Sequence, residues 1–282
     1  MARGGMGEVY EAEDLRLGGR VAVKVLGPEW ADDPTSVDRF KQEIQLAREV
    51  THRGVCRVFD VFEHRRPSEG LVLGLTMELL QGETLEDRLG RAGPMAPEAA
   101  LPLVVQMVEA LQAAHDAGVI HRDLKSSNVM MVPAGGETRV VITDFGLARA
   151  TNRGDDAGLT GDDRVMGTLA YMAPEQLEGG EVGPAADLYA LGTVIYEMVT
   201  GRRPFAGRSA VSNAVRRLQQ APPSPRAVVP GLPVRWERTI LCCLERRPED
   251  RFASPREVVR SLTGTGGLRG SVPRLLRRPR VS

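Results

Sequence analysis

The sequence predicts an α+β protein with two lobes: a small antiparallel sheet with one main helix, followed by a larger and mostly helical lobe. Two observations predict this arrangement. Residues 1–81 contain short apolar runs that suit strands, with one amphipathic helical segment among them. Helical patterns dominate residues 82–262. The length of 282 residues suits one large two-lobed domain or two small domains.

The strands and the helix of the first lobe follow from turn signals and apolar spacing. Glu8–Leu15 and Arg20–Leu26 flank a turn that contains two glycines, which is the pattern of a hairpin. Between Pro34 and Val50, apolar residues recur at helical spacing. Two further apolar runs, Cys56–Phe62 and Leu71–Leu80, predict strands separated by a polar segment.

The second lobe is predicted as a series of helices, with short pieces and a long loop ahead of the central one. Pro184–Thr200 is apolar nearly all round, which is typical of a buried helix. The tail, residues 263–282, is rich in glycine, proline and arginine, and we expect it to be disordered. The predicted helices are Pro97–Ala117, Pro184–Thr200, Arg208–Gln219, Pro233–Glu245 and Ser254–Leu262.

Composition narrows the function classes. The formal net charge is +0, so no global charge points to nucleic acid or acidic lipid. Three cysteines, two of them adjacent, do not suit a disulfide framework, and the histidines show no zinc-ligand spacing with them. Apolar runs fall short of a membrane span, and the start lacks the apolar region of a signal peptide. We therefore expect a cytoplasmic protein without a membrane span and without nucleic acid as a partner.

Three short signals in the first lobe suit phosphate binding, and each has a plainer alternative. Gly4, Gly5 and Gly7 precede a strand, where glycines let backbone N–H groups approach phosphates; a simple turn is the alternative. Lys24 stands in an apolar strand and could bind phosphate or keep its ammonium group in water. Glu43, on the following helix, could hold Lys24 in place or be ordinary surface charge.

The segment His121–Asn128 is more specific, because one loop contains three side chains of complementary chemistry. Asp123 could accept a hydroxyl proton, Lys125 could neutralise a transferring phosphoryl group, and Asn128 could ligate a cation. Asp144 follows an apolar run and precedes a phenylalanine and a glycine, which suits a Mg²⁺ ligand. The alternative for the loop is an ordinary polar connection.

The order of these motifs carries more weight than any one of them. The glycine segment, the strand lysine, the helix glutamate, the Asp123 loop, Asp144 and the segment Gly167–Glu175 follow one another in a single chain. In this order the chain resembles the protein kinase family over about residues 2–262. The resemblance implies a two-lobed protein kinase-like fold.

Details within the motifs narrow the implied function. Segments 5–10 and 171–176 are most similar to bacterial serine/threonine kinases, and Lys125 and Thr168 are typical of enzymes that act on serine or threonine. The resemblance therefore implies transfer of the γ-phosphate of ATP to serine and threonine hydroxyls of protein substrates, in bacterial signalling. It implies ATP and Mg²⁺ as cofactors, with Mn²⁺ as an alternative metal.

The resemblance also assigns roles to individual residues. It makes Asp123 the group that orients and deprotonates the acceptor hydroxyl, with Thr168 tying Asp123 to Lys125. It pairs Lys24 with Glu43 and places Lys24 on the α- and β-phosphates. The implied metal ligands are Asn128 and Asp144, and the implied nucleotide-binding residues are Gly4, Gly5, Met6, Gly7, Val9, Ala22, Lys24, Met77, Glu78, Leu80 and Met130.

Further implied roles are regulatory and structural. Thr160 is the implied autophosphorylation site, whose phosphate would pair with Arg122 and order the surrounding loop; an unmodified loop threonine is the alternative. Autophosphorylation would use a transient homodimer as partner. Glu175 is implied to pair with Arg251, and Asp187 to brace the catalytic loop.

The start of the chain departs from the family pattern. Ala2 occupies the position of the first loop glycine, and the family's first strand precedes this loop, so we expect that strand to be absent and the small lobe to be weakened. This leaves a second function open, that of a pseudokinase that binds ATP as a scaffold. A third alternative is a small-molecule phosphotransferase, although such relatives lack the segment that ends in Ala-Pro-Glu.

Overall fold

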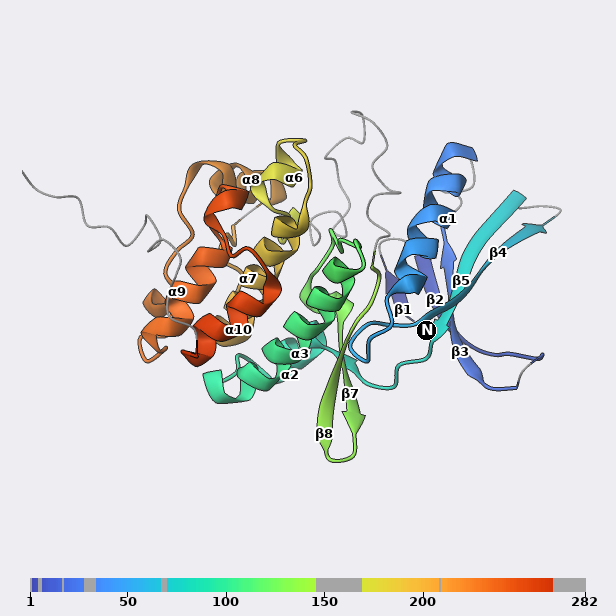
Figure 1. Ribbon diagram of the computed structural model, residues 1–282, viewed down its shortest axis with the longest axis horizontal. Helices are drawn as coiled ribbons and strands as arrows, with labels where there is room; N and C mark the ends of the chain where they lie inside the picture. Colours follow the sequence, from blue (N-terminus) through green and yellow to red (C-terminus); the bar gives the residue numbers. More distant parts are fainter. Residues whose placement is uncertain are drawn as a thin grey trace, which may run out of the picture.

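The computed structural model describes residues 2–4, 7–16, 18–27, 34–66, 70–145, 169–207 and 209–265. These residues form two lobes, with the larger sheet and its helix towards one end of the long axis and most helices towards the other (Figure 1). The predicted α+β, two-lobed fold is confirmed. The predicted tail lies mostly outside the described residues.

A five-stranded antiparallel sheet forms the smaller lobe. Its strands follow the order β1-β2-β3-β5-β4, and each pair of neighbours is antiparallel. β3 is rich in valine, and alternate side chains of this strand, Ala22, Lys24 and Leu26, are buried. The strand bounds are β1 Ala2–Gly4, β2 Gly7–Glu13, β3 Arg20–Leu26, β4 Val58–Arg66 and β5 Gly70–Glu78.

Residues that the sequence analysis assigned to the glycine loop form a three-residue strand. β1 pairs with β2, so that Ala2 lies opposite Val9 and Gly4 opposite Gly7. Three residues are too few for an alternating pattern to be recognised in the sequence. Because β1 lies within the loop segment itself, it does not test whether a strand precedes that loop, and the expected absence of the family's first strand stays a prediction.

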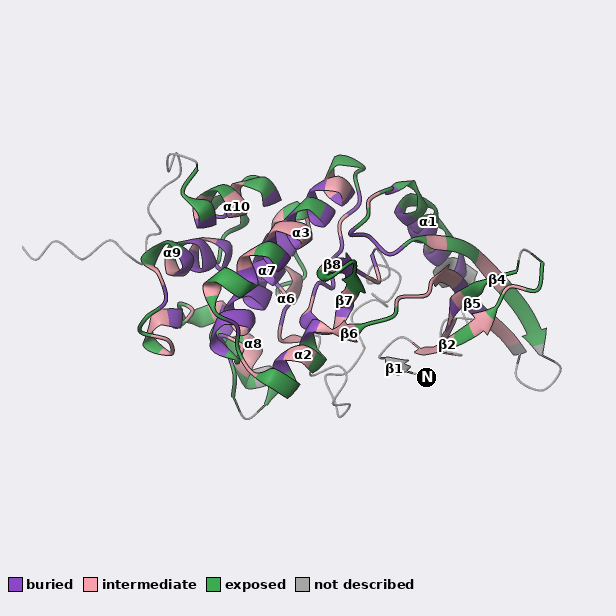
Figure 2. Ribbon diagram, turned by 90° about the horizontal axis from the view of Figure 1, so that it is seen from below, coloured by how far each residue is buried: buried purple, intermediate pink, exposed green. Residues whose placement is uncertain are grey.

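The β4–β5 hairpin is longer than its apolar runs predicted. Most of the polar segment between the predicted strands is paired, with His64 opposite Val72 and Arg66 opposite Gly70. Charged residues can occupy this ladder because the hairpin extends away from the core, where residues 63–65 are exposed (Figure 2). Apolar alternation therefore marked only the part of the hairpin that packs on the protein.

Helix α1 (Pro34–Glu49) covers one face of the sheet. Phe40 and Ile44, one turn apart, are buried against Leu73 and Leu75 of β5. Burying an apolar side chain of this size contributes roughly 1.5–3 kcal/mol. This small core fixes the height of α1 above β3, and so the position of Glu43 relative to the strand that carries Lys24.

The larger lobe is built around α7, which is buried on nearly all sides as predicted. Gly192 allows α9 to approach, since a Cβ at this position would lie 2.5 Å from the Cβ of Cys243. The helices of this lobe are α2 Leu85–Ala92, α3 Pro97–Asp116, α6 Pro174–Leu177, α7 Pro184–Thr200, α8 Ala210–Gln219, α9 Val234–Cys243 and α10 Pro255–Thr263, with 3-10 turns η2 Ser126–Asn128, η3 Pro225–Ala227 and η4 Pro248–Asp250.

The predicted helices of this lobe agree with the structure, and their ends differ by no more than two residues. Helix α2 was not predicted. Its signal was present, because Thr84 and Asp87 form a capping box in which each side chain bonds to the other's backbone N–H. The described helices are all too short or too polar to cross a lipid bilayer.

A second, three-stranded sheet leads into the site. It consists of β6 (Glu83–Thr84), β7 (Val129–Ala134) and β8 (Glu137–Ile142) in that order. Ile142, the last residue of β8, is bonded to the segment before β4 of the smaller lobe. Its N donates to the Gly54 carbonyl (2.8 Å), and its carbonyl accepts from Cys56 N (2.9 Å). The residues that follow β8 are therefore anchored on both sides.

Candidate active site

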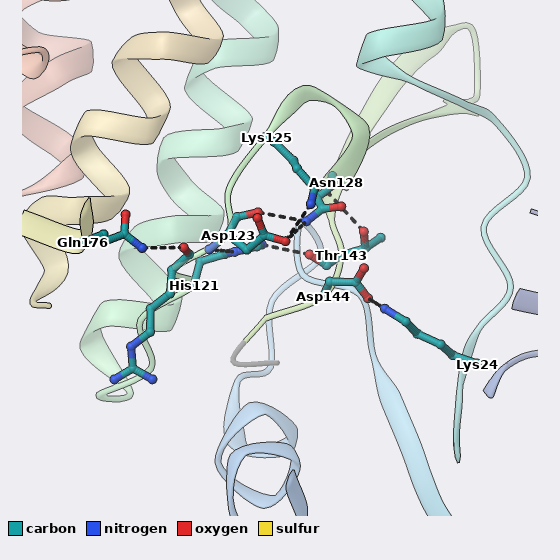
Figure 3. A network of polar contacts seen from close by, with 9 residues as sticks. Lys24, His121, Asp123, Lys125, Asn128, Thr143, Asp144 and Gln176 are labelled. Atoms are coloured by element: carbon teal, nitrogen blue, oxygen red, sulfur yellow. Dashed lines mark hydrogen bonds and ion pairs between the residues drawn. The ribbon is translucent and has the colours of Figure 1, made fainter. Parts of the chain in front are cut away.

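Two loops meet beside the second sheet and form one hydrogen-bonded unit (Figure 3). The first comprises residues 121–128, and the second follows β8. His121 Nε2 donates to the Thr143 carbonyl (2.9 Å), and Thr143 N donates to the Asn128 carbonyl (2.9 Å). The His121 ring also packs against Phe145, with centroids 4.5 Å apart. These contacts bring the segment that carries Asp123 next to the segment that carries Asp144.

Asp123 lies at the centre of the first loop and is almost fully buried. Its Oδ2 accepts from Lys125 Nζ (2.8 Å), and Asn128 Nδ2 donates to its carbonyl (2.9 Å) and reaches the same Oδ2 (3.3 Å). Figure 3 shows the side chains of Lys125 and Asn128 converging on this carboxylate. A carboxylate held in this way has a fixed orientation, which is what a proton acceptor for a bound hydroxyl needs.

Lys24 and Asp144 join the two lobes. Lys24 Nζ lies 2.8 Å from Asp144 Oδ1, and the lysine side chain is 5% exposed. Burial by itself would raise the pKa of the Asp144 carboxyl, but the charge and hydrogen bond of Lys24 outweigh it and lower that pKa. Asp144 also adopts a left-handed backbone conformation (φ 62°), which is unusual for a residue other than glycine. Asp144 is therefore ionised and pre-positioned.

The pair that we expected between Lys24 and Glu43 is not formed in the described part of the chain. Lys24 bonds to Asp144, and Glu43 Oε2 lies 3.6 Å from Arg122 Nη1. Arg122 has a left-handed backbone (φ 65°) and its side chain faces α1, so it competes for the same carboxylate. The sequence indicates these charged groups correctly, but it does not determine which acid each base contacts.

Asp187 of α7 anchors the first loop from beneath. Its Oδ2 accepts from His121 N and from His115 Nε2, both at 2.8 Å, and its Oδ1 accepts from Arg122 N at 2.8 Å. Burial tends to raise the pKa of Asp187, whereas the His115 hydrogen bond and the nearby histidines lower it, and the net direction is down. The sequence alone gave His115 no role, although it stands six residues before His121.

Glu175 and Arg251, which the resemblance pairs, form a buried bidentate ion pair. Arg251 Nη1 lies 2.7 Å from Glu175 Oε1, and Nη2 lies 2.8 Å from Oε2. Arg251 Nη1 also donates to the Ala185 carbonyl (2.8 Å) at the start of α7. This pair fixes α6 against the end of the larger lobe.

Two polar side chains connect the segment around α6 to the first loop, and the sequence analysis gave neither of them a role. Tyr171 shares a hydrogen bond with Ser126 (2.8 Å) and donates to Glu197 (2.6 Å). Gln176 Nε2 donates to the Arg122 carbonyl (2.9 Å), as Figure 3 shows. The chain segment before α7 therefore borders the loop that carries Asp123.

The residues implied to bind the nucleotide are distributed over both lobes. Val9 lies opposite Lys24 and Ala22 opposite Met77 on neighbouring strands of the larger sheet, whereas Met130 is in β7. Glu78 ends β5, and Leu80 follows it; the Glu78 carboxylate pairs with Arg139 (2.9 Å).

The glycine segment is only partly described. Gly4 ends β1 and Gly7 begins β2. A Cβ at Gly7 would lie 1.9 Å from the Val25 carbonyl oxygen, so a side chain is excluded there. Gly5, Met6, Thr160 and Thr168 lie outside the described residues.

The donor set next to Asp123 suits a divalent cation with a preference for oxygen. Asn128 and Asp144 offer an amide oxygen and a carboxylate, which are ligand types that Mg²⁺ accepts. Thr143, which precedes Asp144, bonds through its amide and its hydroxyl to the Asn128 carbonyl (2.9 and 3.3 Å), so the two side chains start from adjacent backbone.

A separate polar cavity of about 220 Å³ lies between the segment before β4, α3 and β8. It is lined by His52, Arg53, Gly54, Gln106, Glu109, Glu137 and Val140. None of these residues belongs to the converging carboxylates and lysines, so we place the candidate chemistry at the Asp123 loop.

Comparison with known proteins agrees with this arrangement. A family model described as "Protein kinase domain" matches residues 1–261. Serine/threonine-protein kinase PknA of Mycobacterium tuberculosis (strain H37Rv) is 42% identical over 254 residues, which is 90% of this chain and 57% of that protein. Serine/threonine-protein kinase PknL of the same strain is 36% identical over 253 residues, or 90% of this chain and 61% of PknL.

A solved structure, the PknI kinase domain of M. tuberculosis, matches with a TM-score of 0.72 and 25% identity, covering 94% of each chain. The chain thus spans less than two thirds of the length of the curated relatives described above.

Proposed function

Because the chain belongs to the protein kinase family, we propose that it transfers the γ-phosphate of ATP to serine and threonine hydroxyls of proteins. One observation carries this proposal: Asp123, Lys125 and Asn128 are bonded together beside the Lys24–Asp144 pair. Phosphoryl transfer depends on positioning and charge stabilisation, which is what such a group of side chains provides. The similarity to PknA and PknL supports serine and threonine as acceptors.

In this proposal the chain's own residues perform separable tasks. Asp123, held by Lys125 and Asn128, accepts the proton of the acceptor hydroxyl, and Lys125 then faces the transferring group. Lys24 binds the α- and β-phosphates after exchanging Asp144 for the nucleotide. Asn128 and Asp144 would hold Mg²⁺, which offsets phosphate charge when bound. A cytoplasmic location, where ATP is available, fits this reaction.

Regulation by phosphorylation is a further part of the proposal. Arg122 contacts Glu43 at 3.6 Å, which is a loose ion pair that a phosphate can replace. If Thr160 is phosphorylated by a second copy of the chain, its phosphate would draw Arg122 away from Glu43. Phosphopeptide mapping after incubation with Mg-ATP tests this step, and an active enzyme with unmodified Thr160 would contradict it.

The test of the proposed function is transfer of radiolabelled phosphate from Mg-ATP to a generic basic protein, followed by phosphoamino acid analysis. We expect phosphoserine or phosphothreonine from the unaltered chain. Lys24→Met and Asp123→Asn should each abolish transfer, since they remove the phosphate contact and the proton acceptor. Circular dichroism of both variants and of the unaltered chain checks that the loss of transfer is not a loss of folding.

ATP binding without transfer by the unaltered chain would instead support the scaffold alternative. Undiminished transfer by Lys24→Met would refute the role that we give to Lys24.

A further inference from the structure

A buried arginine on α8 reaches into the segment that borders the Asp123 loop. Arg217 is 3% exposed, and its guanidinium donates to the carbonyls of Leu169 (2.6 Å), Ala170 (2.7 Å) and Met172 (2.8 Å). Three carbonyls within four consecutive residues are thus bound by one side chain. Helices α6 and α8 lie side by side in Figures 1 and 2, which places α8 directly behind this segment.

The surroundings of Arg217 do not explain it as an ordinary ion pair. Among the described residues, no carboxylate lies within ion-pair distance of Arg217. Arg251, in contrast, pairs with Glu175. The rings of Tyr189 and Phe205 lie 6.0 and 5.9 Å from its guanidinium carbon. Burial lowers the pKa of Arg217, so keeping a cation here has a cost. The three carbonyl dipoles, rather than a counter-charge, replace the water that the guanidinium loses on burial.

The segment that Arg217 holds is also bonded to the loop that carries Asp123. Tyr171, within the segment, shares a hydrogen bond with Ser126 (2.8 Å), and Gln176 donates to the Arg122 carbonyl (2.9 Å). The segment therefore borders the loop whose Asp123 is assigned to the acceptor hydroxyl. The side of the segment that faces the loop is therefore fixed from behind by Arg217.

We propose that Arg217 is a positioning residue for the protein acceptor: it holds the backbone of residues 169–172 in the shape that the acceptor peptide contacts. The inference rests on the proposed kinase function. It concerns acceptor binding rather than ATP binding, because the hydrogen bonds of Arg217 go to residues 169–172, none of which is assigned to the nucleotide. Lysine cannot replace arginine fully, since an ammonium group lacks the planar fork that reaches three carbonyls.

The test is steady-state kinetics with a serine- or threonine-containing peptide, varying peptide and ATP in turn. Arg217→Gln should raise the KM for the peptide, or lower kcat/KM for it, by roughly tenfold, because charged hydrogen bonds to the segment are lost. The KM for ATP should stay within about twofold. The kcat/KM of Arg217→Lys for the peptide should lie between that of the unaltered chain and that of Arg217→Gln. Arg216→Gln is the matched control, because Arg216 is the adjacent, exposed residue of the same helix, and it should behave as the unaltered chain.

The outcomes separate the inference from the function on which it rests. No transfer by the unaltered chain overturns the proposed function itself. If transfer occurs but Arg217→Gln leaves kcat/KM for the peptide unchanged, or shifts the kinetic constants for peptide and ATP together, the positioning role is wrong.

If Arg217→Gln does not fold, Arg217→Lys is compared with the unaltered chain by hydrogen exchange at the amides of residues 170–173. Faster exchange confined to this segment supports the inference, and unchanged exchange contradicts it.

Discussion

At the residue scale, the site depends on buried charges whose partners come from distant parts of the chain. Asp187 accepts three hydrogen bonds from around the first loop, and Lys24 crosses from β3 to Asp144. The residue types of the site could be predicted from the sequence, because their spacing is fixed by loop chemistry. Their pairing could not be predicted. Asp144 and Glu43 are both candidate partners of Lys24, and the side-chain conformation decides which of them it contacts.

Asp187 should give the stability of the protein a specific dependence on pH. Its folded pKa is lowered, so it stabilises the protein above the pKa of an unfolded aspartate, about 3.9, and this contribution is lost as pH falls through the folded value. Asp187→Asn should lower the free energy of unfolding by about 1.5–3 kcal/mol near pH 7. Urea denaturation of both proteins checks this, and the difference should shrink below about pH 4. An equal difference at all pH values would contradict the assignment.

At the element scale, the sequence predicted the elements whose apolar periodicity is complete. Helix α7 follows from a segment that is apolar all round, and α1 from residues such as Phe40 and Ile44 at helical spacing. The missed elements have other determinants. β1 has only three residues, the outer half of the β4–β5 hairpin is polar because it faces water, and α2 is announced by its capping box rather than by periodicity.

The contact between α7 and α9 should be sensitive to a single methyl group. Gly192→Ala would place its Cβ 2.5 Å from Cys243 Cβ, so we expect a loss of roughly 1–3 kcal/mol in the free energy of unfolding. Gly90→Ala is the matched control, because Gly90 lies in α2 with nothing within 4 Å of an added Cβ. The free energy of unfolding of Gly90→Ala should rise by about 0.5–1 kcal/mol. Equal stability of both variants, measured by urea denaturation, would refute the tight packing.

At the scale of the whole molecule, the two lobes meet through few charged contacts. Lys24 with Asp144, Glu43 with Arg122 and Glu78 with Arg139 each join a residue of the first lobe to one of the second. A nucleotide bound between them would contact β3 and the segment after β8 together. Binding should therefore stabilise both lobes as one unit rather than the sheet alone.

Mg-ATP should raise the melting temperature, with a single transition. At a ligand concentration about 100 times Kd, binding adds about 2.7 kcal/mol, or several degrees for a chain of this size. Asp144→Asn should reduce the shift, since it weakens metal binding. Differential scanning fluorimetry with Mg-ATP and with ATP plus EDTA measures both effects. A full shift in the Asp144→Asn variant would argue against its role as a metal ligand.

Arg122 engages three neighbours, and it does so with different atoms. Its amide binds Asp187, its carbonyl binds Gln176, and only its guanidinium reaches Glu43. The first two links use backbone atoms and survive replacement of the side chain by any residue other than proline, whereas the third does not. A substitution at this position should therefore free the small lobe to rock against the large one while the catalytic loop keeps its scaffolding. A substitution of Arg122 therefore allows the relative motion of the two lobes to be measured separately from the integrity of the loop.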